Sequence, residues 1–207
     1  MPSVNPVPST MSPLFLGSHP ATDFLNSAIT PNGIEVEFIG NGEALIDWLV
    51  AAGLLESEIA TQIRLKFDAQ ELDSAAEEVR GLREWARDWV GRWRKAPHKR
   101  YEEEFAHLNR LLKEANTYRE VVWSDESAHV VERTRIESPD QLLAVLAMAL
   151  ALLITNEQSD LVKQCAGAGC SLCFLDKTKG HRRLFCSAAV CGNRTKVAAF
   201  RERQRAS

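Results

Sequence analysis

Four of the five cysteines in the chain form two pairs near its C-terminus, and this arrangement constrains the fold more than any other feature. Cys165 and Cys170 are separated by four residues, and so are Cys186 and Cys191. Four thiolates this close together can close a tetrahedral zinc site, because soft sulfur suits Zn²⁺ and each short loop brings two ligands to one face of the ion. Such a site keeps no coordination position open for water. We therefore expect one zinc ion per chain with a structural role.

Disulfide bonds are the main alternative for these cysteines. The cysteine count is odd, and the N-terminus lacks the basic start and apolar run of a secretory signal. Both observations argue against an oxidising compartment, so we expect a cytoplasmic protein. The longest apolar run, from Leu142 to Ile154, is shorter than the ~20 residues that cross a bilayer as a helix, so we expect no membrane partner.

The residues around the second cysteine pair resemble a known family. Cys186 to Arg194 spell Cys-Ser-Ala-Ala-Val-Cys-Gly-Asn-Arg, and Phe174-Leu175-Asp176 and Arg182-Arg183-Leu184-Phe185 precede them in the same register. Residues 160–205 are similar to the CGNR zinc-finger family. The resemblance implies a small treble-clef-like module over 161–207, with Cys165, Cys170, Cys186 and Cys191 as the zinc ligands.

Two other potential ligands lie within this segment. Cys173 stands where the family usually carries an apolar residue, and we expect it to be a small buried hydrophobic residue. His181 lies in a Lys-Gly-His-Arg-Arg stretch that indicates an exposed turn. Gly192 follows the fourth cysteine and would permit a backbone turn at the metal.

The C-terminal segment is basic and the rest of the chain is acidic. From residue 165 onward nine Lys and Arg stand against two acidic residues, a formal charge of +7, and the whole chain carries −3, so residues 1–164 carry −10. A Zn²⁺ ion on four thiolates would reduce the charge of the segment to about +5. A cationic end on an acidic body favours attraction to the phosphates of double-stranded DNA. A basic patch that docks on the acidic body is the alternative.

The run from Asn193 to Arg203 contains good helix formers and no Pro or Gly, which predicts a helix. Val197 and Phe200 fall on one side of this helix, and we expect them to pack on the zinc module, with basic side chains along both edges. Asn and Arg can pair with base edges, whereas Lys acts as a point charge on phosphate. In the alternative, Asn193 and Arg194 brace the zinc loop. The predicted nucleic-acid contacts are Arg182, Arg183, Asn193, Arg194, Lys196 and Arg201.

After a flexible leader at 1–13, residues 14–160 indicate a mainly helical domain. Apolar periodicity predicts helices over 44–55, 71–94, 101–116 and 141–154, and we expect the last to continue towards Lys163 and lead directly into Cys165. Segments 119–123 and 129–136 predict a β-hairpin joined by 124–127. Trp85, Trp89 and Trp93 form a stripe at four-residue spacing, which we interpret as core or a dimer contact.

This region carries a second resemblance. Gly17 to Ser27 spell Gly-Ser-His-Pro-Ala-Thr-Asp-Phe-Leu-Asn-Ser, and Ala-Leu-Ile-Asp-Trp-Leu at 44–49 and Leu-Arg-Glu at 82–84 follow. These motifs are similar to the ABATE-type helical domain, which commonly precedes a CGNR finger in bacterial stress-response transcription regulators. The chain departs from the family pattern at Thr22, usually Leu, and at Ser27, usually Thr. The resemblance implies a sensor-like body joined to a DNA-binding finger.

Asp23 and Asn26 lie one turn apart on an otherwise apolar segment. Buried polar groups need partners, so the pair either caps neighbouring backbone or lines a small-molecule pocket. His19, just before Pro20, would extend such a pocket or start the helix. We treat His19, Asp23 and Asn26 as candidate contacts of a small-molecule effector.

The sequence shows no Gly-rich phosphate loop, no nucleophile elbow and no His-x-x-x-His pair, so we expect no enzyme. The predicted function is a DNA-binding transcription regulator, and the alternative is a protein–protein adaptor that uses the finger without touching DNA. One finger offers a small contact area, so specific DNA binding would call for a homodimer or an added element. We also expect chelation of the metal to unfold the finger and leave the helical body intact.

Overall fold

The structure is a computed structural model that describes residues 12–31 and 34–205, so most of the predicted leader lies outside the described residues. In chain order the body contains α1 (Pro20–Leu25), β1 (Ala28–Ile29), β2 (Val36–Glu37), α2 (Gly42–Ala51), α3 (Ser57–Lys66), α4 (Ala69–Lys95), α5 (Glu102–Leu112), β3 (Thr117–Ser124), β4 (Ser127–Thr134) and α6 (Gln141–Asn156). A 3₁₀ turn at Ser159–Leu161, β5 (Val162–Gln164), β6 (Cys173–Leu175), a π-helical turn at Ala188–Gly192 and α7 (Asn193–Arg205) follow. The fold is mainly α, as predicted, with antiparallel two-stranded sheets.

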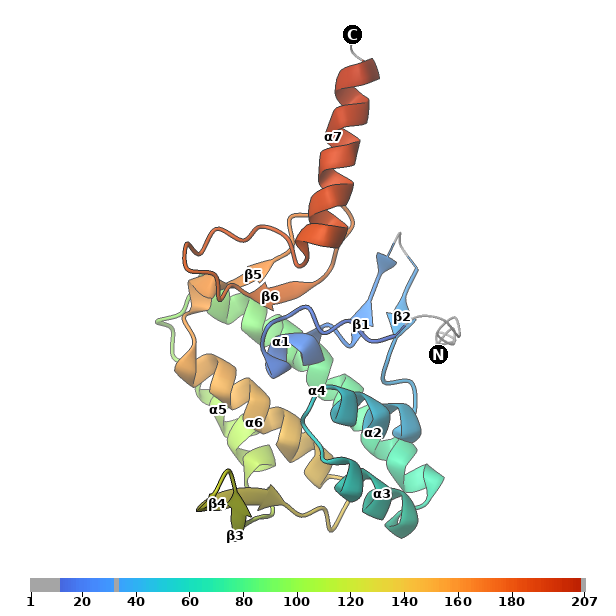
Figure 1. The fold of residues 1–207 in the computed structure, drawn as a ribbon, viewed down its shortest axis with the longest axis vertical. Helices are drawn as coiled ribbons and strands as arrows, with labels where there is room; N and C mark the ends of the chain where they lie inside the picture. The colour runs from blue at the N-terminus through green and yellow to red at the C-terminus, as the bar shows by residue number, and fades with distance from the viewer. Residues whose placement is uncertain (1–11, 32–33, 206–207) are drawn as a thin grey trace.

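Helix α4 is the longest element of the body, and α1, α2 and α6 pack against it (Figure 1). It begins with a capping box, in which Asp68 accepts from the backbone N–H of Glu71 and Glu71 accepts from the backbone N–H of Asp68. Its inner face buries Trp89 and Trp93, so these two members of the tryptophan stripe are core residues. Trp85 is half-buried, and its ring centroid lies 5.1 Å from that of Trp89 with the two rings tilted by 39°.

A buried ion pair ties α4 to the strands that follow α1. Arg83 donates to both carboxylate oxygens of Glu37 at 2.8 and 2.6 Å, and to the hydroxyl of Ser27 at 3.0 Å. Only a pairing with this many hydrogen bonds compensates for taking two charges out of water. The Leu-Arg-Glu motif at 82–84 thus fixes the position of α1, β1 and β2 on the body.

Two helix predictions need correction. Helix α6 ends at Asn156 and does not continue towards Lys163, because the apolar face that it buries stops at Leu153 and polar residues follow. The chain then enters β5, so a strand leads into Cys165. Helix α3 was not predicted as a separate element.

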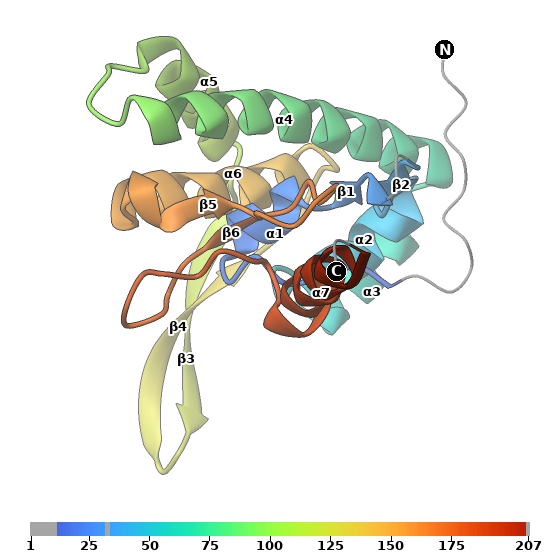
Figure 2. The same cartoon turned by 90° about the horizontal axis from the view of Figure 1, so that it is seen from above.

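The predicted β-hairpin exists, but its first strand is longer than expected and its second strand begins and ends two residues earlier than expected. Strands β3 and β4 pair over eight residues each, from Thr117 opposite Thr134 to Ser124 opposite Ser127. Asp125 and Glu126 have φ of 49° and 65°, the left-handed conformation that a two-residue hairpin turn requires. We call residues 117–134 the β-arm, because they project away from the helices (Figure 2).

The hydrophobic core continues from the body into the cysteine-rich segment. Phe174 and Leu175 of β6 are fully buried in the same cluster as Phe24 of α1. The backbone N–H of Leu175 donates to the carbonyl of Gly17 at 2.7 Å. The two segments therefore share one core.

Among the described residues, we find no helix that combines the length and the apolar character needed to cross a membrane.

Candidate metal centre

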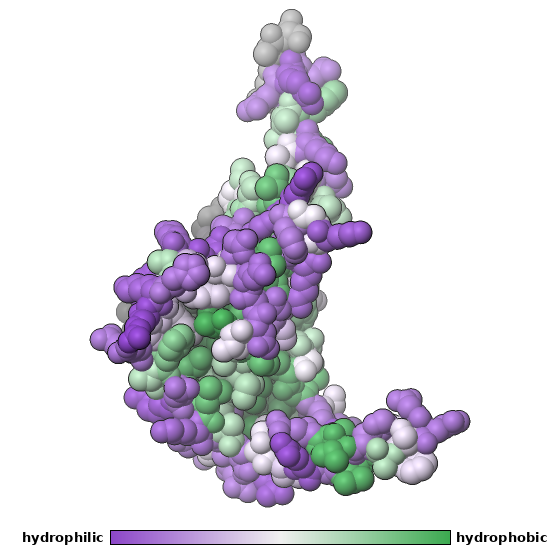
Figure 3. Space-filling model, turned by 90° about the vertical axis from the view of Figure 1, so that its left-hand side faces the viewer, coloured by the Kyte–Doolittle hydropathy of each residue, from purple (hydrophilic) through white to green (hydrophobic). Residues whose placement is uncertain are grey.

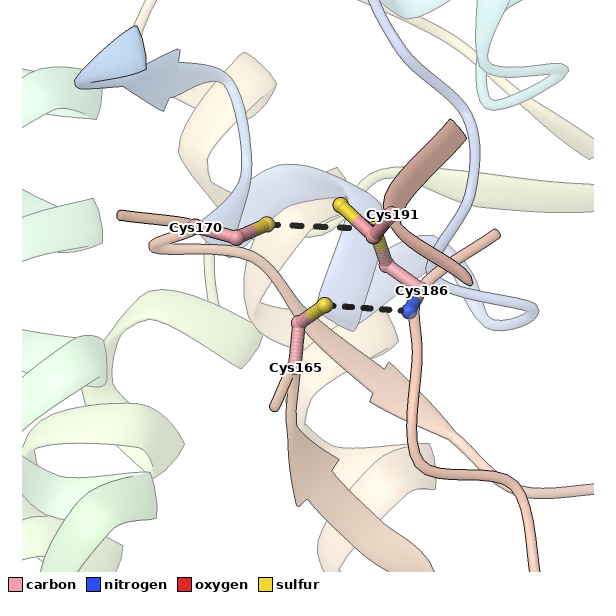
Figure 4. Close-up of side chains that lie close together, drawn as sticks. All are labelled: Cys165, Cys170, Cys186 and Cys191. Atoms are coloured by element: carbon pink, nitrogen blue, oxygen red, sulfur yellow. Dashed lines mark hydrogen bonds between the residues drawn. The ribbon is translucent and has the colours of Figure 1, made fainter. Parts of the chain in front are cut away.

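The four paired cysteines meet at one point, although they come from separate stretches of chain (Figure 4). Cys165 follows β5, Cys170 lies in the loop before β6, Cys186 lies in the long loop after β6, and Cys191 lies in the turn that opens α7. Their sulfur atoms are all within 4.8 Å of one another. This order of hairpin, loop and helix around four thiols is treble-clef-like, as predicted.

The sulfur separations fit a metal ion and exclude disulfide bonds. Sγ of Cys186 lies 3.8 Å from Sγ of Cys170 and 3.6 Å from Sγ of Cys191. A tetrahedral zinc ion with Zn–S bonds of about 2.3 Å places its sulfurs about 3.8 Å apart. All five cysteines are free thiols. Cys165, Cys170, Cys186 and Cys191 could therefore hold a tetrahedral ion with little rearrangement.

Hydrogen-bond donors point at the sulfur of Cys165. The backbone N–H groups of Cys186 and Gly167 approach it at 3.3 and 3.4 Å. Burial raises the pKa of this thiol, but these backbone hydrogen bonds and those with the thiols of Cys170 and Cys186 together lower it, and the net shift of the pKa is downward. Since the thiolate is the form that ligates metals, these donors favour coordination.

The loop between Cys165 and Cys170 depends on two glycines. A Cβ at Gly167 would lie 3.1 Å from Cβ and 3.2 Å from Sγ of Cys191, and Gly169 has φ of 68°. The turn that we expected at Gly192 places no such demand, because a Cβ there would lie 3.7 Å from its nearest neighbours, which is ordinary contact.

The two additional candidate ligands lie outside the cluster of four thiols. Cys173 is buried in β6, where its backbone pairs with Asn26. His181 is exposed, has φ of 48°, and places Nδ1 3.2 Å from the carbonyl oxygen of Asp176.

Asp176, the last residue of the Phe-Leu-Asp motif, organises the long loop of the finger. It is fully buried and accepts hydrogen bonds from Nζ of Lys163 at 2.7 Å, from the hydroxyl of Thr178 at 2.6 Å and from the backbone N–H of Arg183 at 2.9 Å. Burial raises the pKa of Asp176, but the hydrogen bonds from Lys163 and Thr178 hold it well below its usual range. No sequence pattern indicated that Lys163 is a site residue, because it lies outside the cysteine motifs.

The two adjacent arginines of the finger have different surroundings. Arg183 donates to the carbonyls of Phe185 and Leu16 at 2.9 and 3.0 Å and to the hydroxyl of Ser18 at 2.8 Å, and it also donates to the carbonyl of Cys186. Its guanidinium lies 4.2 Å from the ring centroid of Phe174. The expectation that Arg183 faces nucleic acid does not fit this placement, because its donors are used inside the protein. Arg182 is exposed.

Helix α7 extends away from the body, and its described residues are all exposed (Figure 1). Val197 and Phe200 are 47% and 56% exposed, so the expectation that they pack on the zinc module is wrong. At the start of the helix, the hydroxyl of Thr195 donates to the carbonyl of Cys191. Asn193, Arg194, Lys196 and Arg201 are therefore exposed, and Arg194 also donates to Sγ of Cys191 at 3.3 Å.

The candidate effector residues surround α1. Nδ1 of His19 accepts from the backbone N–H of Ala21 and caps the helix, and a carboxylate oxygen of Asp23 accepts from the backbone N–H of Gly17 at 2.7 Å. The side chain of Asn26 pairs with the backbone of Cys173. His19 also lines a cavity beside α6. One carboxylate oxygen of Asp23 and both polar atoms of Asn26 are used by backbone partners.

Comparison with protein families agrees with this architecture. The ABATE family model, described as "Putative stress-induced transcription regulator", matches residues 18–157, and the CGNR zinc-finger model matches residues 162–204. No curated protein matches the chain at a significant level. Because the ABATE model covers more than half of the chain, the protein belongs to the ABATE family and carries a C-terminal CGNR zinc finger.

Proposed function

We propose that the protein is a DNA-binding transcription regulator that binds one structural zinc ion per chain and presents α7 to duplex DNA. The zinc ligands are Cys165, Cys170, Cys186 and Cys191. With all four positions filled by sulfur, the ion has no open site for substrate, so its role is to fix the start of α7 relative to the loop that carries Arg182.

The exposed and basic character of α7 carries this proposal. Residues 193–205 contain five Lys and Arg against Glu202 alone, and the described part of the helix is exposed along its whole length. An α-helix of this kind fits the major groove, where Asn and Arg recognise base edges and Lys meets phosphate. The proposed contacts are Arg182, Asn193, Arg194, Lys196 and Arg201, without Arg183.

A protein–protein adaptor is the second candidate, and one observation favours it. Val190, Val197 and Phe200 are each between 47% and 58% exposed on the finger. Exposed apolar side chains beside a basic helix also suit an acidic protein partner. The adaptor needs no affinity for DNA.

Selection of bound sequences from random duplexes by the zinc-loaded protein, followed by titration at several salt concentrations, separates the two candidates. A regulator enriches a defined sequence, and Lys196→Ala weakens binding to all duplexes and reduces the salt slope by about one unit. Lys113→Ala, at an exposed site on the body, is the matched control and leaves the slope unchanged. Failure to bind any duplex at low salt would leave the adaptor as the better account.

A further inference from the structure

The β-arm exposes an apolar face that the described residues of one chain leave uncovered. Val121, Trp123 and Val130 are 72%, 77% and 66% exposed. Val121 is paired with Val130 in the hairpin, and Trp123 lies two residues further on the same face. A two-stranded hairpin is marginally stable by itself in water. An arm with such a surface is typical of a segment that packs on another molecule.

The base of the β-arm is fastened to the body through its opposite face. Arg133 forms ion pairs with Glu56, before α3, and with Glu120 across the hairpin. Arg135 lies 4.9 Å from the ring centroid of Tyr118, the residue opposite Arg133. The arm is thus held in one direction, with its apolar face left free.

The free face of the arm continues into a groove on α6. A cavity of about 240 Å³ is lined at its base by Thr117, Glu132 and Thr134, which share the face that carries Val121 and Trp123. Met148 and Leu152 of α6 also line it and are 46% and 44% exposed. We call this feature the α6 groove. Figure 3 shows apolar surface in the middle of the body and again on the projecting arm at the lower right.

The arm and the groove match in length. From Thr117 to Trp123 the strand rises about 20 Å at ~3.3 Å per residue. From Gln141 to Leu152, both of which line the groove, the helix rises about 16 Å at 1.5 Å per residue. An arm laid along α6 would therefore cover the groove from end to end, with Trp123 near Leu152.

The charges of the β-arm and of the loop near the α6 groove indicate which molecule the arm contacts. The β-arm carries four acidic residues against Arg119 and Arg133, and its tip is Asp125-Glu126, so nucleic acid and anionic membranes are poor partners. The finger loop at 177–182 contains three Lys and Arg, and the charge of Lys177 acts on His19, which lines the α6 groove. Burial and then the charge of Lys177 lower the pKa of the groove residue His19, while Glu157 opposes them. The acidic tip thus finds a basic loop at the far end of the groove.

We propose that two copies of the chain form a two-fold symmetric dimer in which the β-arm of each copy lies along the α6 groove of the other. Trp123 of one copy covers Met148 and Leu152 of its partner, and the arm tip reaches the basic loop at 177–182. A two-fold interface is self-complementary, so one contact made twice covers both the arm and the groove. This dimer extends the proposed function by pairing two fingers for two DNA half-sites, but its formation requires no DNA.

Sedimentation of the zinc-loaded full chain without DNA, over a wide range of protein concentration, tests the proposal. We expect twice the chain mass of 23.1 kDa. Trp123→Asp on the arm and Met148→Glu in the groove should each weaken dimerisation about tenfold or more. Leu65→Glu is the control, because Leu65 is 84% exposed on α3, away from both surfaces. A monomeric wild type, or full dimerisation of Trp123→Asp, would overturn the proposal.

Mixing the two variants shows whether arm and groove meet each other. A heterodimer of Trp123→Asp and Met148→Glu keeps one intact arm on one intact groove, so the mixture should dimerise more tightly than either variant alone. If the arms paired with each other instead, mixing would restore nothing. Glu126→Lys and Lys177→Glu should each weaken the dimer and restore it when combined, and the absence of this rescue would refute the proposed direction of the arm.

Dimerisation and DNA binding are measured separately, so either proposal can fail without the other. A monomer that binds duplex DNA would refute the dimer and leave the proposed function standing. A dimer that binds no duplex DNA would refute the proposed function and leave the dimer standing.

Discussion

The carboxamide of Asn26 makes two hydrogen bonds with the backbone of Cys173, donating to its carbonyl at 2.8 Å and accepting from its N–H at 2.9 Å. The two residues are 147 positions apart in the chain. An Asn side chain that pairs with both backbone groups of one residue replaces a neighbouring strand. The side chain of Asn26 therefore holds the end of α1 against β6 through the same two backbone groups that a neighbouring strand would use.

Asn26→Ala should destabilise the protein by roughly 2–6 kcal/mol, because it leaves a buried N–H and a buried carbonyl without partners at about 1–3 kcal/mol each. Chemical denaturation followed by circular dichroism measures the loss. Asn109→Ala, at an exposed site on α5, should change stability by less than about 0.5 kcal/mol. Equal stability of the two variants would mean that the pairing contributes nothing.

Removal of the metal should lower the melting temperature of the helical body as well as unfold the finger. This differs from the expectation drawn from the sequence, because Phe174 and Leu175 of the finger are buried in the core of the body. Thermal unfolding of zinc-loaded and chelated protein, followed by tryptophan fluorescence, reports on the body through Trp48 and Trp89. Cys165→Ser, which lacks a zinc ligand, serves as the control and should respond little to chelator. An unchanged melting temperature after chelation would show that the two segments are independent.

The adjacent residues Arg182 and Arg183 form a matched pair for mutation. Arg183→Gln should cost roughly 2–4 kcal/mol of stability, because several carbonyls lose their donor. Arg182→Gln should cost less than about 0.5 kcal/mol and weaken DNA binding instead. Denaturation and duplex titration of both variants separate the roles. The assignment fails if Arg182→Gln proves the more destabilising.

Asp23 should make stability depend on pH. Burial raises its pKa to about 6, although the N–H of Gly17 and the charge of Arg183 oppose this. The unfolded pKa is near 3.9, so the folded state binds the proton more tightly, and the contribution is complete below about pH 4 and lost as pH rises to about 6. After allowance for solvent screening we expect at most ~1–2 kcal/mol.

Asp23→Asn keeps an acceptor for Gly17 and removes the titration. The difference in unfolding free energy between wild type and Asp23→Asn, measured from pH 4 to pH 7, should therefore grow in favour of the variant. A difference that stays constant over this range would show that the pKa of Asp23 is not raised.

Patterns that depend on several residues predicted the structure well. The cysteine spacing located all four clustered thiols, and apolar periodicity located α2, α4, α5 and α6, because a buried stripe leaves a repeated mark in the sequence. Helix α3 left a weaker mark, since it buries only Ala60 and Ile63 and its first residue follows Glu56, which makes no side-chain cap. The end of α6 was missed because helix propensity does not show where its burial stops.

The sequence could not predict the direction in which individual side chains and helix α7 point. Arg182 and Arg183 are identical neighbours, and only the chain path past Leu16 and Ser18 makes the second an internal donor. Val197 and Phe200 have the spacing of a packed stripe. Whether anything lies opposite that stripe depends on the angle at which α7 leaves the metal, which no local pattern encodes.

The projection of α7 has a consequence for the energetics of recognition. Helices shorter than about 12–15 residues are marginal in water without tertiary contacts, and α7 has 13 residues whose described side chains are exposed. Its outer turns must therefore lose conformational entropy when they meet a partner, which lowers the affinity per unit of contact area. Selection could adjust the affinity of this protein through residues that touch nothing, simply by changing how helical α7 is before it binds.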